Sequence, residues 1–120
     1  MTEHAEQCAL FEWANVMART EQMPELENLY AIPNGGHRHK ATAAKLKAEG
    51  VKAGVLDVHL PVARRGYHSC YIEMKYGKNK LTDSQQDWKQ RLEAGKNYVG
   101  VCYSADEAIS ELTWYLGYEP

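Results

Sequence analysis

Three charged residues interrupt two segments that otherwise have the composition of β-strands. Asp57 stands between Leu56 and Val58, and Glu73 and Lys75 lie in the segment YIEMK. Side chains alternate between the two faces of a strand, so Glu73 and Lys75 share one face and Asp57 points away from its apolar neighbours. If the two segments pair, two carboxylates and one ammonium group meet at one place on a sheet.

Two carboxylates in a partly desolvated site repel each other unless a cation lies between them. Oxygen ligands favour hard divalent ions, so we expect Mg²⁺ or Mn²⁺, with the backbone carbonyl of Met74 as a further ligand. Lys75 would hold, or help to deprotonate, a water molecule beside the metal. This set suits phosphodiester hydrolysis, because the metal neutralises developing charge and lowers the pKa of the attacking water. The alternative is a plain salt bridge from Lys75 to Asp57 or Glu73 on a solvated sheet face.

The elements that must position these groups follow from the pattern of apolar residues. Helical spacing and capping signals predict four helices, at residues 3–19, 40–50, 82–95 and from the Ser104–Glu107 capping box onward. Alternation predicts four strands, at residues 28–33, 55–62, 67–74 and 97–103. The resulting order indicates an α/β fold with a mixed central β-sheet flanked by helices. At 120 residues we expect a single domain over residues 1–120.

Charge is distributed unevenly along the chain, although the net charge is only -2. Residues 37–80 hold ten Lys and Arg against three acidic residues, near +7, whereas the flanks hold four against thirteen, near -9. Such a chain can present a basic face to phosphates, although scattered solvated charges are the alternative. The NGGHR turn offers backbone amides and a guanidinium to a phosphate, unless it is a plain turn. The candidate nucleic-acid-binding residues are Asn34, Arg38, Lys40, Lys45, Lys47, Lys52, Lys78 and Lys80.

The rest of the composition indicates an ordinary cytoplasmic protein. No apolar run approaches the length of a membrane span, and the first residues are acidic rather than typical of a signal peptide. Cys8, Cys70 and Cys102 form no CxxC pair, so we expect reduced, partly buried thiols.

Five histidines raise the possibility of a zinc site. The candidate ligands are His37, His39, His59 and Asp57. Their spacing matches none of the common zinc patterns, so His59 is better interpreted as a neighbour of the acidic site.

Four motifs, in this order and spacing, resemble the VRR-NUC family of the PD-(D/E)xK nuclease superfamily: NGGHR, VKAGVLDV, YIEMK and LTDSQQDW. The family's Gly-x-x-x-Gly-x-Pro-Asp stretch corresponds to Gly50, Gly54 and Asp57, with Leu56 in place of the proline. Proline there shapes the entrance to the strand and is not a ligand, so the expected chemistry is unaffected. The family's Ile-Glu-x-Lys strand corresponds to YIEMK.

Two helices carry the remaining part of the resemblance. Gln85 stands three residues before Trp88, and Glu3 stands four residues before Gln7, as in the family. The resemblance implies that Gln85 hydrogen-bonds the attacking water or a metal-bound carboxylate. It also implies that Glu3 joins the outer shell of the metal, whereas a carboxylate that simply favours the helix dipole is the alternative.

The resemblance covers nearly the whole chain and implies a restriction-endonuclease-like core in a minimal, stand-alone domain like that of phage-encoded members. It implies a Mg²⁺- or Mn²⁺-dependent endodeoxyribonuclease with catalytic residues Asp57, Glu73, Lys75, Gln85 and Glu3. The family's similarity to Holliday-junction resolvases implies branched or four-way DNA as the substrate. The alternatives are a non-catalytic nucleic-acid-binding module and a sequence-specific restriction-type nuclease.

A homodimer is the expected assembly. Resolution of a four-way junction requires two active sites related by a two-fold axis. In the last predicted helix, Trp114 and Tyr118 fall away from the apolar stripe, and exposed aromatic side chains are typical of interfaces. We therefore expect Trp114 or Tyr118 at the dimer interface, although a loop that folds over them is an alternative.

Overall fold

The computed structural model describes residues 2–33 and 40–120, and in this part of the chain it confirms the predicted α/β class and element order. The helices are α1 (Glu3–Arg19), α2 (Lys40–Ala48), α3 (Asp83–Ala94) and α4 (Ala105–Leu116), with a 3₁₀ helix η1 (Pro24–Asn28). The strands are β1 (Tyr30–Ala31), β2 (Val58–Leu60), β3 (Cys70–Met74) and β4 (Tyr98–Cys102). The 3₁₀ helix η1, which begins with a proline, was not predicted. The first strand covers only Tyr30–Ala31 of the predicted residues 28–33.

The four strands form one mixed sheet in the order β1-β2-β3-β4. The β1–β2 and β2–β3 pairs are antiparallel, and the β3–β4 pair is parallel. The parallel pair requires a crossover connection, which α3 provides. Ile72 of β3 lies opposite Val58 of β2 and Gly100 of β4, so the chain before β2 runs beside the end of β3.

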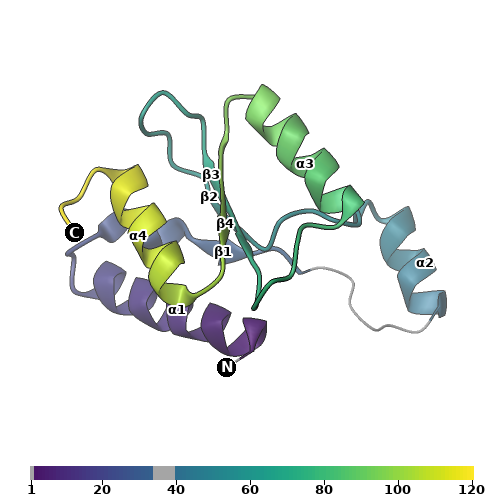
Figure 1. Cartoon of the computed structure of the whole chain (residues 1–120), viewed down its shortest axis with the longest axis horizontal. Helices are drawn as coiled ribbons and strands as arrows, with labels where there is room; N and C mark the ends of the chain where they lie inside the picture. The colour runs from purple at the N-terminus through teal and green to yellow at the C-terminus, as the bar shows by residue number, and fades with distance from the viewer. Residues whose placement is uncertain (1, 34–39) are drawn as a thin grey trace.

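The two faces of the sheet have different environments. One face packs against α1 and α4, where Leu10, Ile72, Met74 and Leu112 belong to the buried hydrophobic core. Alternation along β3 turns Glu73 to the opposite face, which α3 partly covers (Figure 1). Apolar burial on the first face supplies the stability that allows charged groups to occupy the second.

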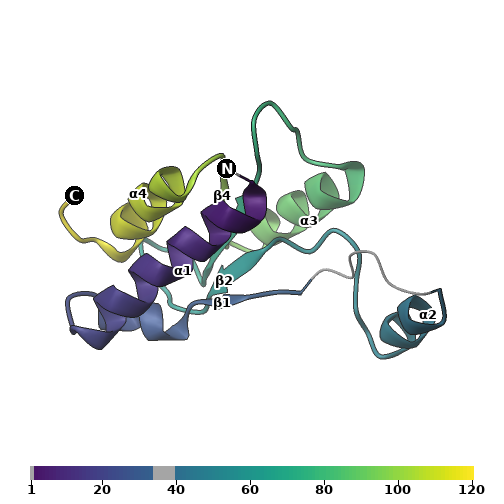
Figure 2. The ribbon, with the colours of Figure 1, turned by 90° about the horizontal axis from the view of Figure 1, so that it is seen from below.

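Helix α2 lies at one end of the molecule, apart from α1 and α4, in both views of the ribbon (Figures 1 and 2). Its Lys and Ala side chains from Thr42 onward are exposed, and Leu46 is half-buried. Across the described residues, none of the helices has both the length and the apolar character needed to cross a bilayer.

The loop that leads into β2 packs against α3 and is hydrogen-bonded to it. Gly54 has a φ of +81°, and a Cβ atom there would lie 2.5 Å from Ser84 Oγ and 2.7 Å from the Ser84 carbonyl carbon. Trp88 Nε1 donates a hydrogen bond of 2.9 Å to the Ala53 carbonyl. The glycine and the tryptophan of the sequence motifs therefore hold together the two segments that carry Asp57 and Gln85.

We predict that Gly54→Ala lowers the free energy of unfolding by about 2 to 3 kcal/mol, because it adds a steric clash to an unfavourable φ. Gly50→Ala is the matched control. Its φ is +101° but nothing lies within 4 Å of the added Cβ, so we expect a loss of about 1 kcal/mol. Urea denaturation of the two variants measures the difference, and equal losses would contradict the proposed close contact with Ser84.

Candidate active site

Asp57 and Glu73 are joined by reciprocal hydrogen bonds between side chains and backbone. The Asp57 N–H donates to Glu73 Oε1 at 3.1 Å, and the Met74 N–H donates to Asp57 Oδ2 at 2.9 Å. Asp57 directly precedes β2, and the antiparallel register of Val58 with Ile72 places it opposite Glu73. Each carboxylate thus accepts a backbone N–H from the other segment, which fixes both side chains.

Gln85 holds the Glu73 carboxylate from the opposite side. Thr82 is the N-cap of α3, and its N–H donates to Gln85 Oε1 at 2.9 Å while its hydroxyl accepts the Gln85 N–H at 3.2 Å. Because the Oε1 atom of Gln85 accepts this hydrogen bond, its Nε2 group points away from Thr82 and is free to donate to another residue. Gln85 Nε2 donates to Glu73 Oε2 at 2.9 Å, so one side chain both begins α3 and positions a carboxylate.

Lys75 lies next to the carboxylates without making a close ion pair. Its Nζ is 3.9 Å from Glu73 Oε2, and its backbone N–H donates to the Cys102 carbonyl at 2.8 Å. Glu73 is only 1% exposed and Lys75 only 7% exposed. The structure therefore brings Asp57, Glu73, Lys75 and Gln85 into one cluster, in which Glu73 and Lys75 are buried and Asp57 and Gln85 are half-buried.

The cluster raises the pKa of Glu73 to about 8. Burial is the main cause, and the neighbouring Asp57 carboxylate adds to it. The nearby Lys75 ammonium and the Asp57 N–H act in the opposite direction but do not compensate. At neutral pH the two carboxylates therefore lack sufficient positive charge from the protein.

The donor set fits a hard divalent cation. Two carboxylates supply oxygen ligands, and the oxygens of Glu73 can accept more than one interaction each. Among the residues that the structure describes, no group of three or more His, Cys, Asp or Glu side chains is placed to hold a metal. Two carboxylates with a backbone carbonyl and water are nevertheless sufficient for Mg²⁺, which usually keeps several waters.

The assignment of Glu3 to the outer shell of the metal stays a prediction. Glu3 lies in the first turn of α1, and in the described part of the chain its carboxylate makes no hydrogen bond or ion pair. Glu6, in the same turn of α1, does make a hydrogen bond: its Oε1 accepts the Ala105 N–H of α4 at 3.2 Å. Its other oxygen is buried without a partner among the described residues. The sequence contained no signal for this contact, which spans 99 positions.

The predicted nucleic-acid-binding residues fall into two exposed groups. Lys45 and Lys47 belong to α2 with Lys52 just after it, and Lys78 and Lys80 lie between β3 and α3. The first group precedes Asp57 in the chain, and the second follows Lys75. Asn34 and Arg38 lie outside the described residues, as does the side chain of Lys40.

Only two of the four candidate zinc ligands, His59 and Asp57, belong to the described residues. His37 and His39 lie outside the described residues, and His59 is hydrogen-bonded to Tyr30 and Ser69. The cysteines are free, with Cys70 and Cys102 buried and Cys8 exposed.

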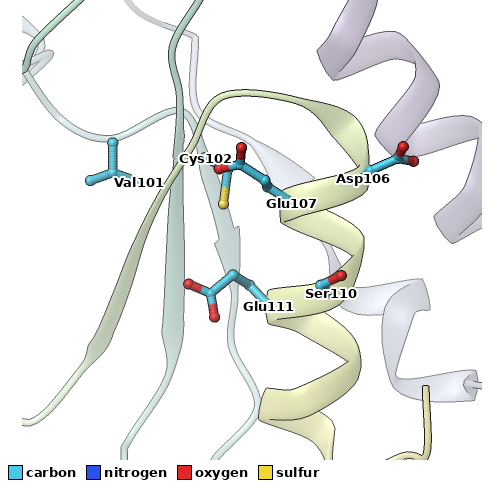
Figure 3. Close-up of a pocket in the computed structure, with 6 residues that line it drawn as sticks. All are labelled: Val101, Cys102, Asp106, Glu107, Ser110 and Glu111. Atoms are coloured by element: carbon cyan, nitrogen blue, oxygen red, sulfur yellow. The ribbon is translucent and has the colours of Figure 1, made fainter.

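An acidic pocket lies between β4 and α4, where Glu107 and Glu111 point from the helix toward the strand (Figure 3). Both carboxylates have partners: Tyr98 donates to Glu111 Oε2 at 2.9 Å, and the Tyr103 N–H donates to Glu107 Oε1 at 3.1 Å. The pocket contains no basic side chain, so it is unsuited to bind a phosphate group.

Comparisons with known proteins agree with this geometry. The model of the VRR-NUC domain matches residues 2–106. A solved structure described as a VRR_NUC domain protein is similar, with a TM-score of 0.79 and 27% sequence identity. The match covers 98% of this chain and 92% of that chain. A comparison with curated proteins found no match.

The raised pKa of Glu73 predicts that the metal-free protein loses stability as the pH rises. Between pH 7 and pH 8 the folded state retains a proton that the unfolded state has already lost, so the free energy of unfolding should fall by about 1 kcal/mol. His59 does not interfere, because burial lowers its pKa and it is neutral above pH 7. Urea denaturation in EDTA measures this loss.

Glu73→Gln is the control for this titration, because it cannot ionise. The substitution changes the hydrogen bond between residue 73 and Gln85 equally at both pH values. The free energy of unfolding of Glu73→Gln should therefore vary less between pH 7 and pH 8 than that of the wild type. Equal pH dependence in the two proteins would contradict the assignment to Glu73.

Proposed function

This chain belongs to the VRR-NUC family, whose domain implies a nuclease of the PD-(D/E)xK type, and we propose that it is a Mg²⁺- or Mn²⁺-dependent endonuclease that hydrolyses DNA phosphodiester bonds. The observation that carries the proposal is the partly buried cluster of Asp57, Glu73, Lys75 and Gln85 at the ends of two paired strands. A purely structural role does not explain two neighbouring carboxylates that the positive charge of Lys75 does not fully compensate.

In the proposed site, Asp57, Glu73 and the Met74 carbonyl would hold the cation. When bound, the cation neutralises charge on the scissile phosphate and lowers the pKa of the attacking water. Gln85 keeps one Glu73 oxygen in place through the capping box of α3, so the ligand cannot rotate away. Lys75 orients the water and adds positive charge beside the phosphate.

We predict that Asp57→Asn and Glu73→Gln each lower DNA cleavage by at least about a thousandfold, because each removes a charged ligand. Lys75→Met should lower cleavage by a similar amount while metal binding persists. The measurement is the rate of cutting of linear, flapped and four-way DNA with Mg²⁺ or Mn²⁺.

Glu12→Gln is a suitable control for these variants, since it removes an exposed carboxylate of α1 that lies outside the cluster. It should cut at the wild-type rate. Wild-type cutting by a folded Glu73→Gln protein would refute the site. Binding without metal-dependent cutting of any DNA would favour the non-catalytic binding module.

The two exposed lysine groups, Lys45–Lys47–Lys52 and Lys78–Lys80, are the proposed contacts to the DNA backbone. Phosphate contacts of this kind release counterions, so affinity should fall steeply with salt. We predict that the double variant Lys45→Glu/Lys47→Glu weakens binding at least tenfold and reduces the slope of log Kd against log salt by about two.

Arg19→Glu/Lys96→Glu makes the same change in net charge at exposed positions outside both lysine groups. It should weaken binding much less and leave the salt slope nearly unchanged. Equal effects of the two double variants would show that net charge, rather than the lysine groups, determines DNA affinity.

We further propose that the enzyme acts on branched DNA as a homodimer that incises two strands. Trp114 of α4 is 42% exposed and lies beneath the Arg65 guanidinium, 4.2 Å from the ring centroid. It lines an apolar groove between α1 and α4 together with Trp13 and Ile109. Tyr118 also lines this groove. It follows the left-handed turn at Gly117, and its hydroxyl donates a hydrogen bond of 2.7 Å to Glu25. Tyr118 is therefore half-buried, rather than exposed as predicted.

We predict that the wild-type protein sediments as a dimer at micromolar concentration or on four-way DNA, and that Trp114→Glu shifts it to the monomer. Trp114→Glu places a charge in the proposed interface. Val16→Glu is the control, because Val16 is also exposed but does not line this groove. A strict monomer with and without DNA would rule out paired incision by a stable dimer.

A further inference from the structure

Three rings form a row across the sheet on the face that carries Asp57 and Glu73. Tyr30 of β1, His59 of β2 and Tyr71 of β3 are register partners. The His59 and Tyr71 rings stack with centroids 4.2 Å apart and planes 20° from parallel. Tyr30 meets His59 edge to face, with centroids 5.3 Å apart. These rings lie outside the hydrophobic core that α1 and α4 cover.

A hydrogen-bond chain fixes the orientation of the middle ring. Asn97 Nδ2 donates to the Leu92 carbonyl at the end of α3, so its Oδ1 faces Ser69, whose hydroxyl donates to it at 2.7 Å. The Ser69 hydroxyl hydrogen is then occupied, and His59 Nε2 must donate to Ser69 Oγ across 3.0 Å. His59 Nδ1 is left as the acceptor for the Tyr30 hydroxyl at 2.7 Å.

This chain makes the row neutral and rigid before any ligand arrives. Burial lowers the pKa of His59, in agreement with a ring that carries one proton. The Tyr30 hydroxyl points inward to His59. Because Tyr30 is nevertheless 48% exposed, we infer that the exposed part of its side chain is mainly the ring. Cross-strand packing explains the His59–Tyr71 contact, but it does not require an exposed aromatic ring on the edge strand.

The row is continuous with the acidic cluster. His59 lies two residues after Asp57, and Tyr71 lies two residues before Glu73, on the same faces of their strands. Two residues of a strand span about 7 Å, which equals about two base steps of DNA at roughly 3.4 Å each. A nucleotide whose phosphate lies at the cluster therefore has its neighbouring bases within reach of the rings.

We propose that Tyr30, with His59 and Tyr71 behind it, is a stacking site for an unpaired nucleobase next to the scissile phosphate. The inference rests on the proposed nuclease function and adds that, among branched DNAs, those that expose an unpaired nucleotide near the cut, such as a flap, bind most tightly. A paired base already has its faces stacked within the duplex, whereas an unpaired base can offer a face to an aromatic ring. Aromatic stacking tolerates any base sequence, so the site selects DNA structure rather than sequence.

The test is binding of two DNA probes that carry 2-aminopurine, whose fluorescence falls when it stacks. One probe places it in a flap next to the branch point, and the other places it in a fully paired duplex, with Ca²⁺ in place of Mg²⁺ to suppress cutting. Wild-type protein should quench the flap probe and bind it at least about fivefold more tightly than the duplex. Tyr30→Leu should lose the quenching and most of this preference.

Tyr30→Phe is the matched control, because it keeps the ring and removes only the hydroxyl that contacts His59. It should retain both the quenching and the preference. Equal affinity of the wild type for the two probes, or an unchanged preference in folded Tyr30→Leu, would overturn the inference. Cleavage with no flap preference overturns this inference alone, whereas absence of cleavage on every DNA overturns the proposed function.

Discussion

The structure depends on one costly arrangement, two carboxylates held against each other at the ends of β2 and β3, with Glu73 buried and Asp57 half-buried. Asp57 and Glu73 are held by backbone N–H groups from each other's segments, so neither can turn toward solvent without breaking a strand-end hydrogen bond. Burial of Glu73, with repulsion by Asp57 as the smaller cause, then raises the pKa of Glu73. A protein that needed only stability would gain from apolar residues at these positions, so the pair is best explained by a ligand that carries positive charge.

The rest of the fold supports this pair from two directions. The hydrophobic core on the α1–α4 face stabilises the sheet, while α3 on the opposite face contributes Gln85 to Glu73. The contact of Gly54 with Ser84 fixes the loop before Asp57 to the same helix. Helix α3 therefore sets the separation of the two strand ends, and small movements of this helix would change the geometry of the site.

Much of the fold and part of the site were predictable from the sequence. The alternation around Glu73 predicted its position in a strand, and the helix that carries Gln85 is capped by Thr82 at its predicted start. Asp57 was predicted within a strand but lies just before β2. Local periodicity was less informative where structure depends on distant contacts. The tie between Glu6 and Ala105, the hydrogen bond from Tyr118 to Glu25 and the chain through His59 all join residues that are far apart in sequence. No spacing rule connects such pairs, because register and turn geometry decide them.

The proposed cation site can be tested by metal binding in the absence of DNA. Titration of Mn²⁺ into the protein, with free Mn²⁺ measured by its electron paramagnetic resonance signal, reports occupancy without any assumption about the substrate. We expect saturable binding by the wild type and by Glu12→Gln, and its loss in Asp57→Asn and Glu73→Gln. A wild-type protein that leaves Mn²⁺ free at millimolar concentration, or folded variants that bind as the wild type does, would contradict the proposed cation site.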